Sequence, residues 1–122
     1  ITNKIDKNVN IKVIPAYFES IFFNLISNSI KYKKEHKDPE ILITSAVKDD
    51  FLVIKFKDKG RGIDLKLNKN KIFGMYKTFH NHKDSRGLGL FLTKNQIEAM
   101  QGKIHVKSKV DLGTTFSIYF KL

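Results

Sequence analysis

The amino-acid sequence predicts an α+β two-layer sandwich, in which a mixed, mainly antiparallel sheet carries helices on one face. Short runs that alternate or are rich in β-branched and aromatic residues indicate strands, and two longer segments have helical periodicity. Their order is strand, helix, strand, strand, helix, strand, strand. Consecutive strands with helices grouped between them favour this architecture. The length suits one domain, 1–122, because a chain of this size holds one hydrophobic core.

Each element follows from local residue signals. Pro15 fits the first turn of a helix that runs to about Lys34, because proline has no backbone N–H to lose there. A second helix covers about 88–101 and ends at Gly102, a good helix terminator. Five strands are predicted, over residues 8–13, 41–47, 51–56, 103–109 and 114–120. The segment 59–86 is long for a connection inside a compact domain, and such segments are usually functional lids.

Composition limits the class of protein. Hydrophobic residues make up 41% of the chain, enough for a compact globule. The absence of cysteine excludes disulfides and thiolate metal sites and fits a cytoplasmic setting. No apolar run approaches the roughly 18–20 residues of a membrane span, and no secretory signal is visible. Because the chain begins with Ile1, we expect a fragment of a longer protein. We expect the fragment to be cytoplasmic with no membrane contact of its own, although the full-length protein can be membrane-anchored.

The chain is strongly basic, with 23 Lys and Arg against 12 Asp and Glu and a net charge of +11. Arg61 and Arg86 are the two arginines, and the other basic residues are lysines. Proteins that read nucleic-acid bases usually do so with arginine. The charge therefore favours a solvated lysine-rich surface, with an anionic partner as the alternative and nucleic acid as an unfavoured one.

The first predicted helix carries a polar stripe at the edge of its apolar face. At about 100° per residue, Asn24, Asn28 and Lys31 fall close together. Asparagine is a poor helix former, so two of them four residues apart need a reason. An amide oxygen is a hard ligand suited to Mg²⁺, and a lysine is a point charge suited to phosphate. The alternative is a polar helix side that happens to contain asparagine twice.

Asp58 ends a predicted strand in which alternation places it on the same face as Ile54 and Phe56. A carboxylate on an apolar face needs a partner. One interpretation is that it accepts hydrogen bonds from the following turn. The other is that it accepts from the exocyclic amino group of a base, with Gly60 and Gly62 allowing the backbone to pass close to the ring.

Two further glycine motifs have both an ordinary and a functional interpretation. Gly87 and Gly89 are predicted to precede the second helix, whose free N–H groups and dipole would attract an anion, with Arg86 beside them. The lysine and hydroxyl residue of a P-loop are missing, which excludes a Walker-type site. Gly113 is followed by Thr114, which belongs either to a simple hairpin or to a strand whose hydroxyl bonds a base.

In this order, the motifs NLISNSIKY, DKGRGI, KIFGMYKTF, RGLGL and GTTF resemble the Asn box, first glycine box, phenylalanine box, second glycine box and closing Gly-Thr motif of one family. That family is the ATP-binding catalytic domain of bacterial sensor histidine kinases, in the GHKL superfamily with the gyrase, mismatch-repair and heat-shock chaperone ATPases. The resemblance extends from about residue 8 to the end and implies the Bergerat ATP-binding fold, with about three helices on one face. Lys59 departs from the asparagine of many members, but alternation points it away from the site.

The resemblance also implies site residues for ATP and Mg²⁺. Asn28 is expected to bind the metal, with Asn24 supporting metal or phosphates. Asp58 would hold the adenine amino group, and Thr114 would reach the adenine side. The expected catalytic residues are Asn28, Lys31 and Arg86. The remaining expected ATP contacts, which shape the pocket or the lid, are Tyr32, Gly60, Gly62, Ile63, Phe73, Gly87, Leu88, Gly89 and Leu90. Phe73 and Phe79 would anchor the lid hinge.

The function implied by the resemblance is donation of the γ-phosphate of Mg-ATP to a histidine on a separate dimerisation domain of the same protein, with a response regulator receiver domain downstream. The four histidines of this chain lack the family's phosphoacceptor setting and are expected to be surface or packing residues: His36, His80, His82 and His105. Isolated, the domain should show little activity. The alternatives are a serine kinase of the anti-sigma-factor type, a catalytically inactive nucleotide-binding module and a basic nucleic-acid-binding domain.

Overall fold

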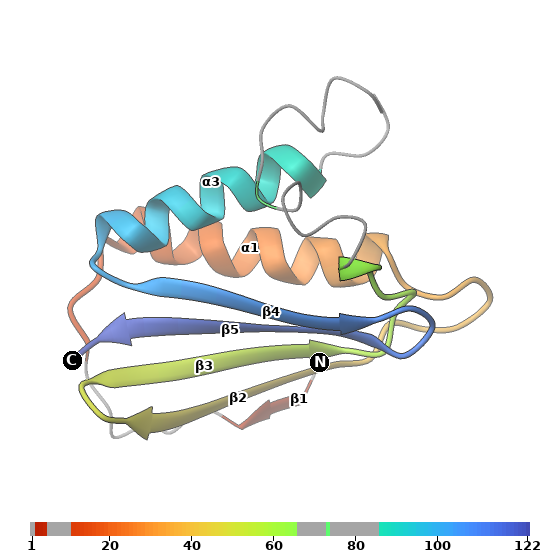
Figure 1. The fold of residues 1–122 in the computed structure, drawn as a ribbon, viewed down its shortest axis with the longest axis horizontal. Coiled ribbons are helices and arrows are strands. Elements are labelled where there is room, and N and C mark those ends of the chain that lie inside the picture. Colours follow the sequence, from red (N-terminus) through yellow and green to blue (C-terminus); the bar gives the residue numbers. More distant parts are fainter. Residues whose placement is uncertain (1, 5–10, 66–72, 74–85) are drawn as a thin grey trace.

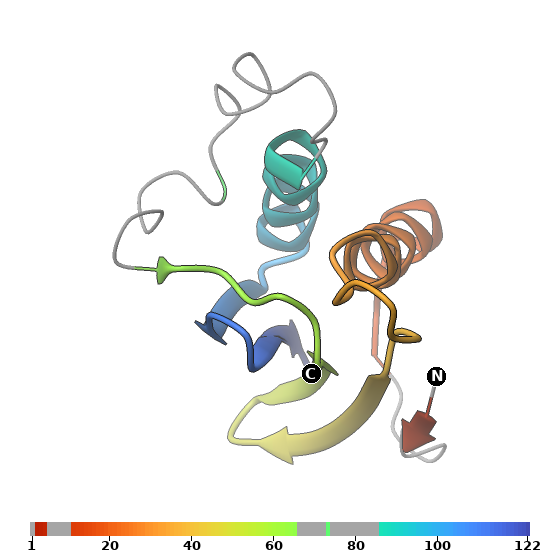
Figure 2. The ribbon, with the colours of Figure 1, turned by 90° about the vertical axis from the view of Figure 1, so that its right-hand side faces the viewer.

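The structure, a computed structural model, describes residues 2–4, 11–65, 73 and 86–122. A five-stranded sheet forms one layer, and two helices pack side by side on one of its faces (Figures 1 and 2). The helices are α1 (Pro15–Lys31) and α3 (Arg86–Ala99). The strands are β1 (Thr2–Lys4), β2 (Ile41–Lys48), β3 (Phe51–Asp58), β4 (Lys103–Lys109) and β5 (Gly113–Lys121). The predicted two-layer α+β sandwich is confirmed.

The sheet has the strand order β1-β2-β3-β5-β4. Strand β1 pairs with β2 in parallel, and all other neighbours are antiparallel. The prediction of a mixed, mainly antiparallel sheet is therefore confirmed. The register pairs Asp58 at the end of β3 with Thr114 at the start of β5. Two residues far apart in the sequence, both singled out as candidate site residues, thus lie opposite each other.

The predicted strand over 8–13 is wrong in its described part. Residues 11–13 form no strand, and residues 8–10 lie outside the described residues. The strand in this part of the chain is β1, which comes earlier and pairs with β2. Ile11 and Val13 pack partly buried against the core. The alternation in the sequence therefore reflects packing of an extended segment and not pairing in the sheet.

Both helices begin or end at residues other than those predicted. Helix α1 starts at Pro15 as expected but ends at Lys31, three residues early. Helix α3 lies two residues earlier at each end than predicted, because Gln101 adopts a left-handed φ of 63° and the Gly102 N–H donates to the Ile97 carbonyl. About three helices were expected, and the described residues contain two.

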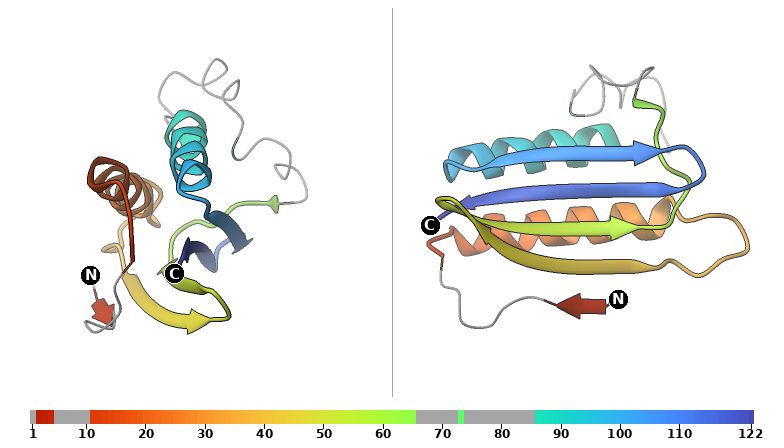
Figure 3. Two further views of the ribbon diagram at one scale, coloured as in Figure 1. Left: turned by 90° about the vertical axis from the view of Figure 1, so that its left-hand side faces the viewer. Right: turned by 60° about the horizontal axis from the view of Figure 1, so that its bottom comes forward.

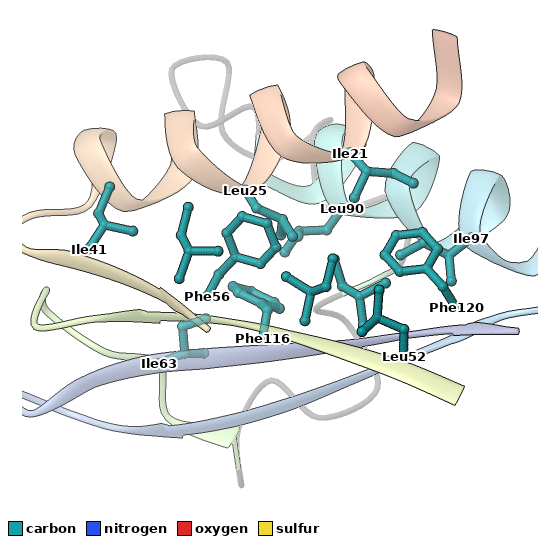
Figure 4. Packing of buried hydrophobic residues seen from close by; sticks show 13 residues of the cluster. Ile21, Leu25, Ile41, Leu52, Phe56, Ile63, Leu90, Ile97, Phe116 and Phe120 are labelled. Atoms are coloured by element: carbon teal, nitrogen blue, oxygen red, sulfur yellow. The ribbon is translucent and has the colours of Figure 1, made fainter. Parts of the chain in front are cut away.

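The core lies between the helices and the sheet (Figure 4). Ile21 and Leu25 reach down from α1, and Leu90 and Ile97 reach down from α3, all with no exposed surface. They meet large side chains of the sheet such as Phe56, which is 1% exposed. Burial of each such side chain stabilises the fold by about 2 kcal/mol. The core fixes both helices over one face, and no helix of the described residues covers the other face of the sheet (Figure 3).

Candidate functional site

Asp58 lies at the centre of a hydrogen-bonded cluster at one end of the sheet. Its Oδ1 accepts from the Gly60 N–H at 2.9 Å and from the Thr114 N–H at 3.2 Å. Its Oδ2 lies 3.1 Å from the hydroxyl of Ser29, a buried residue of α1. The predicted orientation toward the helix layer and the interpretation that the following turn donates to Asp58 are both confirmed. Contact with a base stays a prediction.

The turn after Asp58 packs tightly between the end of α1 and the end of β4. The Arg61 N–H donates to the Tyr32 carbonyl at the end of α1. A Cβ on Gly60 would lie 2.6 Å from that carbonyl oxygen, and a Cβ on Gly62 would lie 2.0 Å from the Lys109 carbonyl oxygen. Gly62 also has a φ of +73°, which other residues rarely adopt. Both glycines are therefore required by packing, whatever they do for a ligand.

A hydroxyl network fastens this turn to the β4–β5 hairpin. The Ile63 N–H donates to Ser108 Oγ at 2.7 Å, and that oxygen lies 2.8 Å from Thr114 Oγ1. Thr114 is buried, whereas Thr115 belongs to the opposite face of the sheet, beside Lys107. Of the two threonines, Thr114 is the one beside Asp58, and its contact with the adenine stays a prediction.

Asn24 links the two helices. Its Nδ2 donates to Thr93 Oγ1 at 3.2 Å, and Thr93 donates in turn to the Gly89 carbonyl at 2.8 Å. Thr93 is completely buried. Asn24 thus holds the first turns of α3 against the middle of α1, a structural task that the sequence did not indicate.

Asn28 lies one turn farther along α1, toward the end of the helix that lies beside the start of α3 (Figure 1). Its side-chain nitrogen is buried, and no described residue offers it an acceptor. An amide donor left without an acceptor in the interior costs about 1–3 kcal/mol. Folding of the described residues does not explain this asparagine. Lys31 ends the same helix and is exposed.

The first turn of α3 contains the second glycine motif. Gly87 and Gly89 were predicted to precede the helix, but they lie inside its first turn, since α3 begins at Arg86. The leading N–H groups of a helix have no partner within it. Among the described residues, a Cβ on Gly89 would meet only the Asn24 side chain, at 4.0 Å, so none of them requires glycine there by close contact. The side chains of Arg86 and Leu88 lie outside the described part.

Other predicted site residues contribute mainly to packing. The side chains of Leu90 and Ile63 are buried in the core, so at most their backbones are available to a ligand. Phe73 is partly buried against the same core, with Lys94 Nζ 5.7 Å from its ring centroid. Tyr32 has the guanidinium of Arg61 over its ring at 5.3 Å. Phe79 lies outside the described residues.

The structure also tests several residues that were predicted to take no part in the site. Lys59 points away from the site and forms an exposed ion pair with Glu40 at 3.3 Å, as expected. His36 and His105 are exposed, which confirms them as surface residues. His80 and His82 lie outside the described residues. In the part of the chain that the structure describes, no three His, Asp or Glu side chains gather as a metal cluster, and no helix is long and apolar enough to span a membrane.

Sequence reasoning missed three hydroxyl residues that organise the site: Ser29 and Thr93, which are buried, and Ser108, which is partly buried. Two of them had a signal. Ser29 falls four residues after the buried Leu25 on the core side of α1, and Ser108 alternates with Ile104 and Val106 on the inner face of β4. A polar residue at a core position indicates a hydrogen-bond partner across the interface.

Comparisons with known proteins agree with this geometry. Residues 14–122 match the family model described as histidine kinase-, DNA gyrase B-, and HSP90-like ATPase. The signal transduction histidine-protein kinase ArlS of Staphylococcus aureus (strain USA300) is 32% identical over 98% of this chain, and the strain COL protein gives the same values. The chain spans about a quarter of these relatives, 27% of their length.

Two nucleotide-free structures of the catalytic domain of the histidine kinase ThkA share the fold. One superposes with a TM-score of 0.82 at 21% identity and covers 98% of this chain and 78% of the other. A second crystal form gives 0.77 at 19% identity, with coverage of 98% and 76%. At this level of identity the likeness shows a common fold.

Proposed function

The chain belongs to the family of histidine kinase-, DNA gyrase B- and HSP90-like ATPases, and we propose that it is the ATP-binding catalytic domain of a sensor histidine kinase. In this role it holds Mg-ATP and presents the γ-phosphate to a histidine on a separate dimerisation domain. A response regulator receiver domain then takes the phosphoryl group. The domain works in the bacterial cytoplasm, as part of a longer protein that can be membrane-anchored.

The observation that carries the proposal is the buried side-chain nitrogen of Asn28, for which no described residue supplies an acceptor. It lies on the part of α1 that faces the start of α3, where helix N–H groups and Lys31 provide further positive character. A phosphate oxygen would satisfy this donor, and the amide oxygen of the same residue is a hard ligand of the kind that Mg²⁺ accepts. The residues present therefore fit a magnesium nucleotide.

Asp58 is the proposed anchor for the base at the other end. The Gly60 and Thr114 N–H groups hold its Oδ1. Oδ2, which the Ser29 hydroxyl orients, keeps further acceptor capacity for the exocyclic amino group of adenine. A charged acceptor held in advance binds a donor at little entropic cost.

Bound Mg-ATP supplies the transferable phosphoryl group and neutralises part of its charge. Asn28 would hold the metal and phosphates, and Lys31, Arg86 and the first turn of α3 would stabilise the negative charge of the phosphates. The catalytic contribution of this chain is positioning and electrostatics. The phosphoacceptor, and with it any general base, belongs to the separate dimerisation domain.

Calorimetric titration with ATP and Mg²⁺ tests the nucleotide site. We expect micromolar-range binding by the wild-type chain and a loss of about 100-fold in Asp58→Asn, since a hydrogen bond to a charged group contributes up to about 3 kcal/mol. Asp49→Asn is the matched control, because it removes the same charge from an exposed turn with a φ of 54°, which asparagine tolerates. GTP, which has a carbonyl in place of the adenine amino group, should bind far more weakly. Equal affinity for ATP in wild-type and Asp58→Asn would exclude the base anchor.

Phosphotransfer in a longer protein that includes the dimerisation domain tests the reaction. Incorporation of the γ-phosphate as an acid-labile, base-stable phosphoryl group indicates phosphohistidine. Acid-stable label would favour the serine kinase alternative. Binding of ATP without transfer to either residue type would favour an inactive nucleotide-binding module.

A further inference from the structure

The face of the sheet opposite the helices, which Figure 3 shows from the front on its right, carries a regular pattern of basic residues. In two rows across the strands, a short hydroxyl side chain of β5 lies between a lysine of β3 and a basic residue of β4. The rows are Lys57–Thr115–Lys107 and Lys55–Ser117–His105. Adjacent strands are about 4.8 Å apart. The long basic side chains of β3 and β4 therefore stand on either side of the shorter Thr115 and Ser117 side chains, which form the floor between them.

These residues line a hollow of about 660 Å³, together with Lys48 and Tyr119. We call it the cation trough, defined by Lys48, Lys55, Lys57, His105, Lys107, Thr115, Ser117 and Tyr119. None of the lining residues that the structure describes is acidic. The ion pairs among the described residues involve Lys59 and Lys121, which lie outside the trough. The positive charge of the trough is thus not neutralised by the described part of the chain.

We propose that the cation trough binds an extended acidic polypeptide segment. Along a strand, residues on one face repeat every two positions, about 6.6 Å, and Lys55 and Lys57 have this spacing. Carboxylates at alternate positions of an extended peptide have the same repeat, so successive acidic side chains meet successive lysines. The hydroxyls of Thr115 and Ser117 on the floor add donors for a carboxylate oxygen.

The composition of this face favours a peptide over nucleic acid or a membrane. The aromatic rings of the face are already covered, with Lys103 Nζ 4.6 Å from the Tyr119 ring centroid and Lys121 Nζ 5.3 Å from that of Phe51. Such rings offer little surface for stacking a base, and the trough contains no arginine. It also has no aliphatic lining residue that would insert into a bilayer.

The trough and the proposed nucleotide site lie on opposite faces of the sheet, although Lys57, Lys107 and Thr115 also line a small hollow with Asp58 and Thr114 at the end of the strands. Asp58 is hydrogen-bonded to Ser29 of α1, and Asn28 belongs to the same helix, whereas the trough residues of β3 and β5 alternate with core residues and so lie on the other face of the sheet. Figures 2 and 3 show both helices on one side of the sheet. An acidic segment and ATP can therefore bind at the same time, and loss of one need not remove the other. The proposal goes beyond phosphoryl transfer, because it concerns a partner that recognises this domain by its outer face.

Fluorescence anisotropy with a labelled, capped peptide of alternating Glu and Ser tests this proposal at about 100 mM salt. The variant Lys55→Gln/Lys107→Gln should lower the affinity about tenfold, because it removes one lysine from each side of the floor. Lys12→Gln/Lys37→Gln is the matched control, with the same change in net charge at exposed positions outside the trough. It should change the affinity less than about twofold. ATP affinity should be unchanged in both.

Several results would overturn the proposal. Equal weakening by both double variants would mean that the net charge of +11 attracts the peptide without a site. A peptide with its Glu residues in one block lacks the alternate spacing of carboxylates. If it bound with equal affinity, the match between carboxylate spacing and lysine spacing would not explain the binding. Tighter binding of oligo(dT), or of vesicles rich in phosphatidylserine, with the same dependence on Lys55 and Lys107, would assign the trough to nucleic acid or to a membrane surface. Absence of peptide binding would reject it outright.

Discussion

The two ends of the candidate site differ in how far folding alone explains their residues. At the Asp58 end, Gly60 and Gly62 are required by close carbonyl oxygens, and Asp58 itself accepts two backbone hydrogen bonds. At the Asn28 end, the buried amide nitrogen has no acceptor among the described residues, and nothing crowds Gly89. The residues of the first end are explained by packing and hydrogen bonding alone, and their contact with a nucleotide is proposed in addition. The described residues do not explain the second end, for which we propose a ligand, so substitutions there separate binding from folding.

The largest effect should come from Gly62→Ala. An alanine Cβ would lie 2.0 Å from the Lys109 carbonyl oxygen, at a backbone φ of +73°. Strain and displacement of β4 should lower the free energy of unfolding by about 3 kcal/mol. Thermal and urea unfolding measure this loss. A stable Gly62→Ala protein that has lost only ATP binding would show that this glycine serves the ligand and not the fold.

Asn28→Ala, in contrast, should lower the affinity for ATP without lowering the stability of the fold. The free energy of unfolding should stay equal or rise by up to about 1 kcal/mol, because a buried donor without an acceptor is removed and alanine favours the helix. Affinity for Mg-ATP should fall about 100-fold, since metal and phosphate contacts are lost together. Asn95→Ala, the same change at an exposed position of α3, should leave ATP binding intact. A destabilised Asn28→Ala with normal ATP affinity would reverse the comparison between the two ends.

Ser29→Ala should have an intermediate effect on both properties. Its hydroxyl lies 3.1 Å from both Asp58 Oδ2 and the Leu25 carbonyl. Loss of one net hydrogen bond should cost about 1 kcal/mol, equivalent to about fivefold in ATP affinity, with a similar loss in unfolding free energy. Ser27→Ala, on the same helix, is the control. Unchanged affinity in Ser29→Ala would mean that Asp58 is held well enough by Gly60 and Thr114.

Gly89→Ala should give the smallest change in stability. It should also separate an effect on ATP binding from an effect on folding most clearly. Alanine in a helix is favoured over glycine by about 0.5–1 kcal/mol, and no close contact opposes it, so the protein should become slightly more stable. If phosphates approach the backbone there, ATP affinity should fall several-fold, as calorimetry can measure. Higher stability with undiminished ATP affinity would remove Gly89 from the phosphate site.

The sequence was sufficient for the parts of the molecule that local periodicity determines. Alternation placed Asp58 on the inner face, and helical phase grouped Asn24 with Asn28. Four of the five predicted strands match within two residues. These features depend on residues that are close together in the sequence, so they follow from the sequence alone.

The rest depends on contacts between distant segments. The interhelical hydrogen bond of Asn24 needs Thr93, and the role of Ser29 needs Asp58, so neither follows from spacing. The alternation of Ile11 and Val13 looked like a strand because burial against a core and burial in a sheet leave the same pattern. The left-handed Gln101 moved a helix end that Gly102 was expected to set.

The position of β4 at the margin of the sheet has a further consequence, for solubility. The strand order ends with β4, so one row of its backbone groups has no strand partner in the described sheet. An edge strand with unpaired backbone groups can pair with a strand of another chain, which leads to aggregation. Every second residue of β4 is an exposed Lys or His, at positions 103, 105, 107 and 109. Two copies brought together along this strand would oppose like charges, so the domain should remain monodisperse at high concentration and become aggregation-prone when those lysines are neutralised.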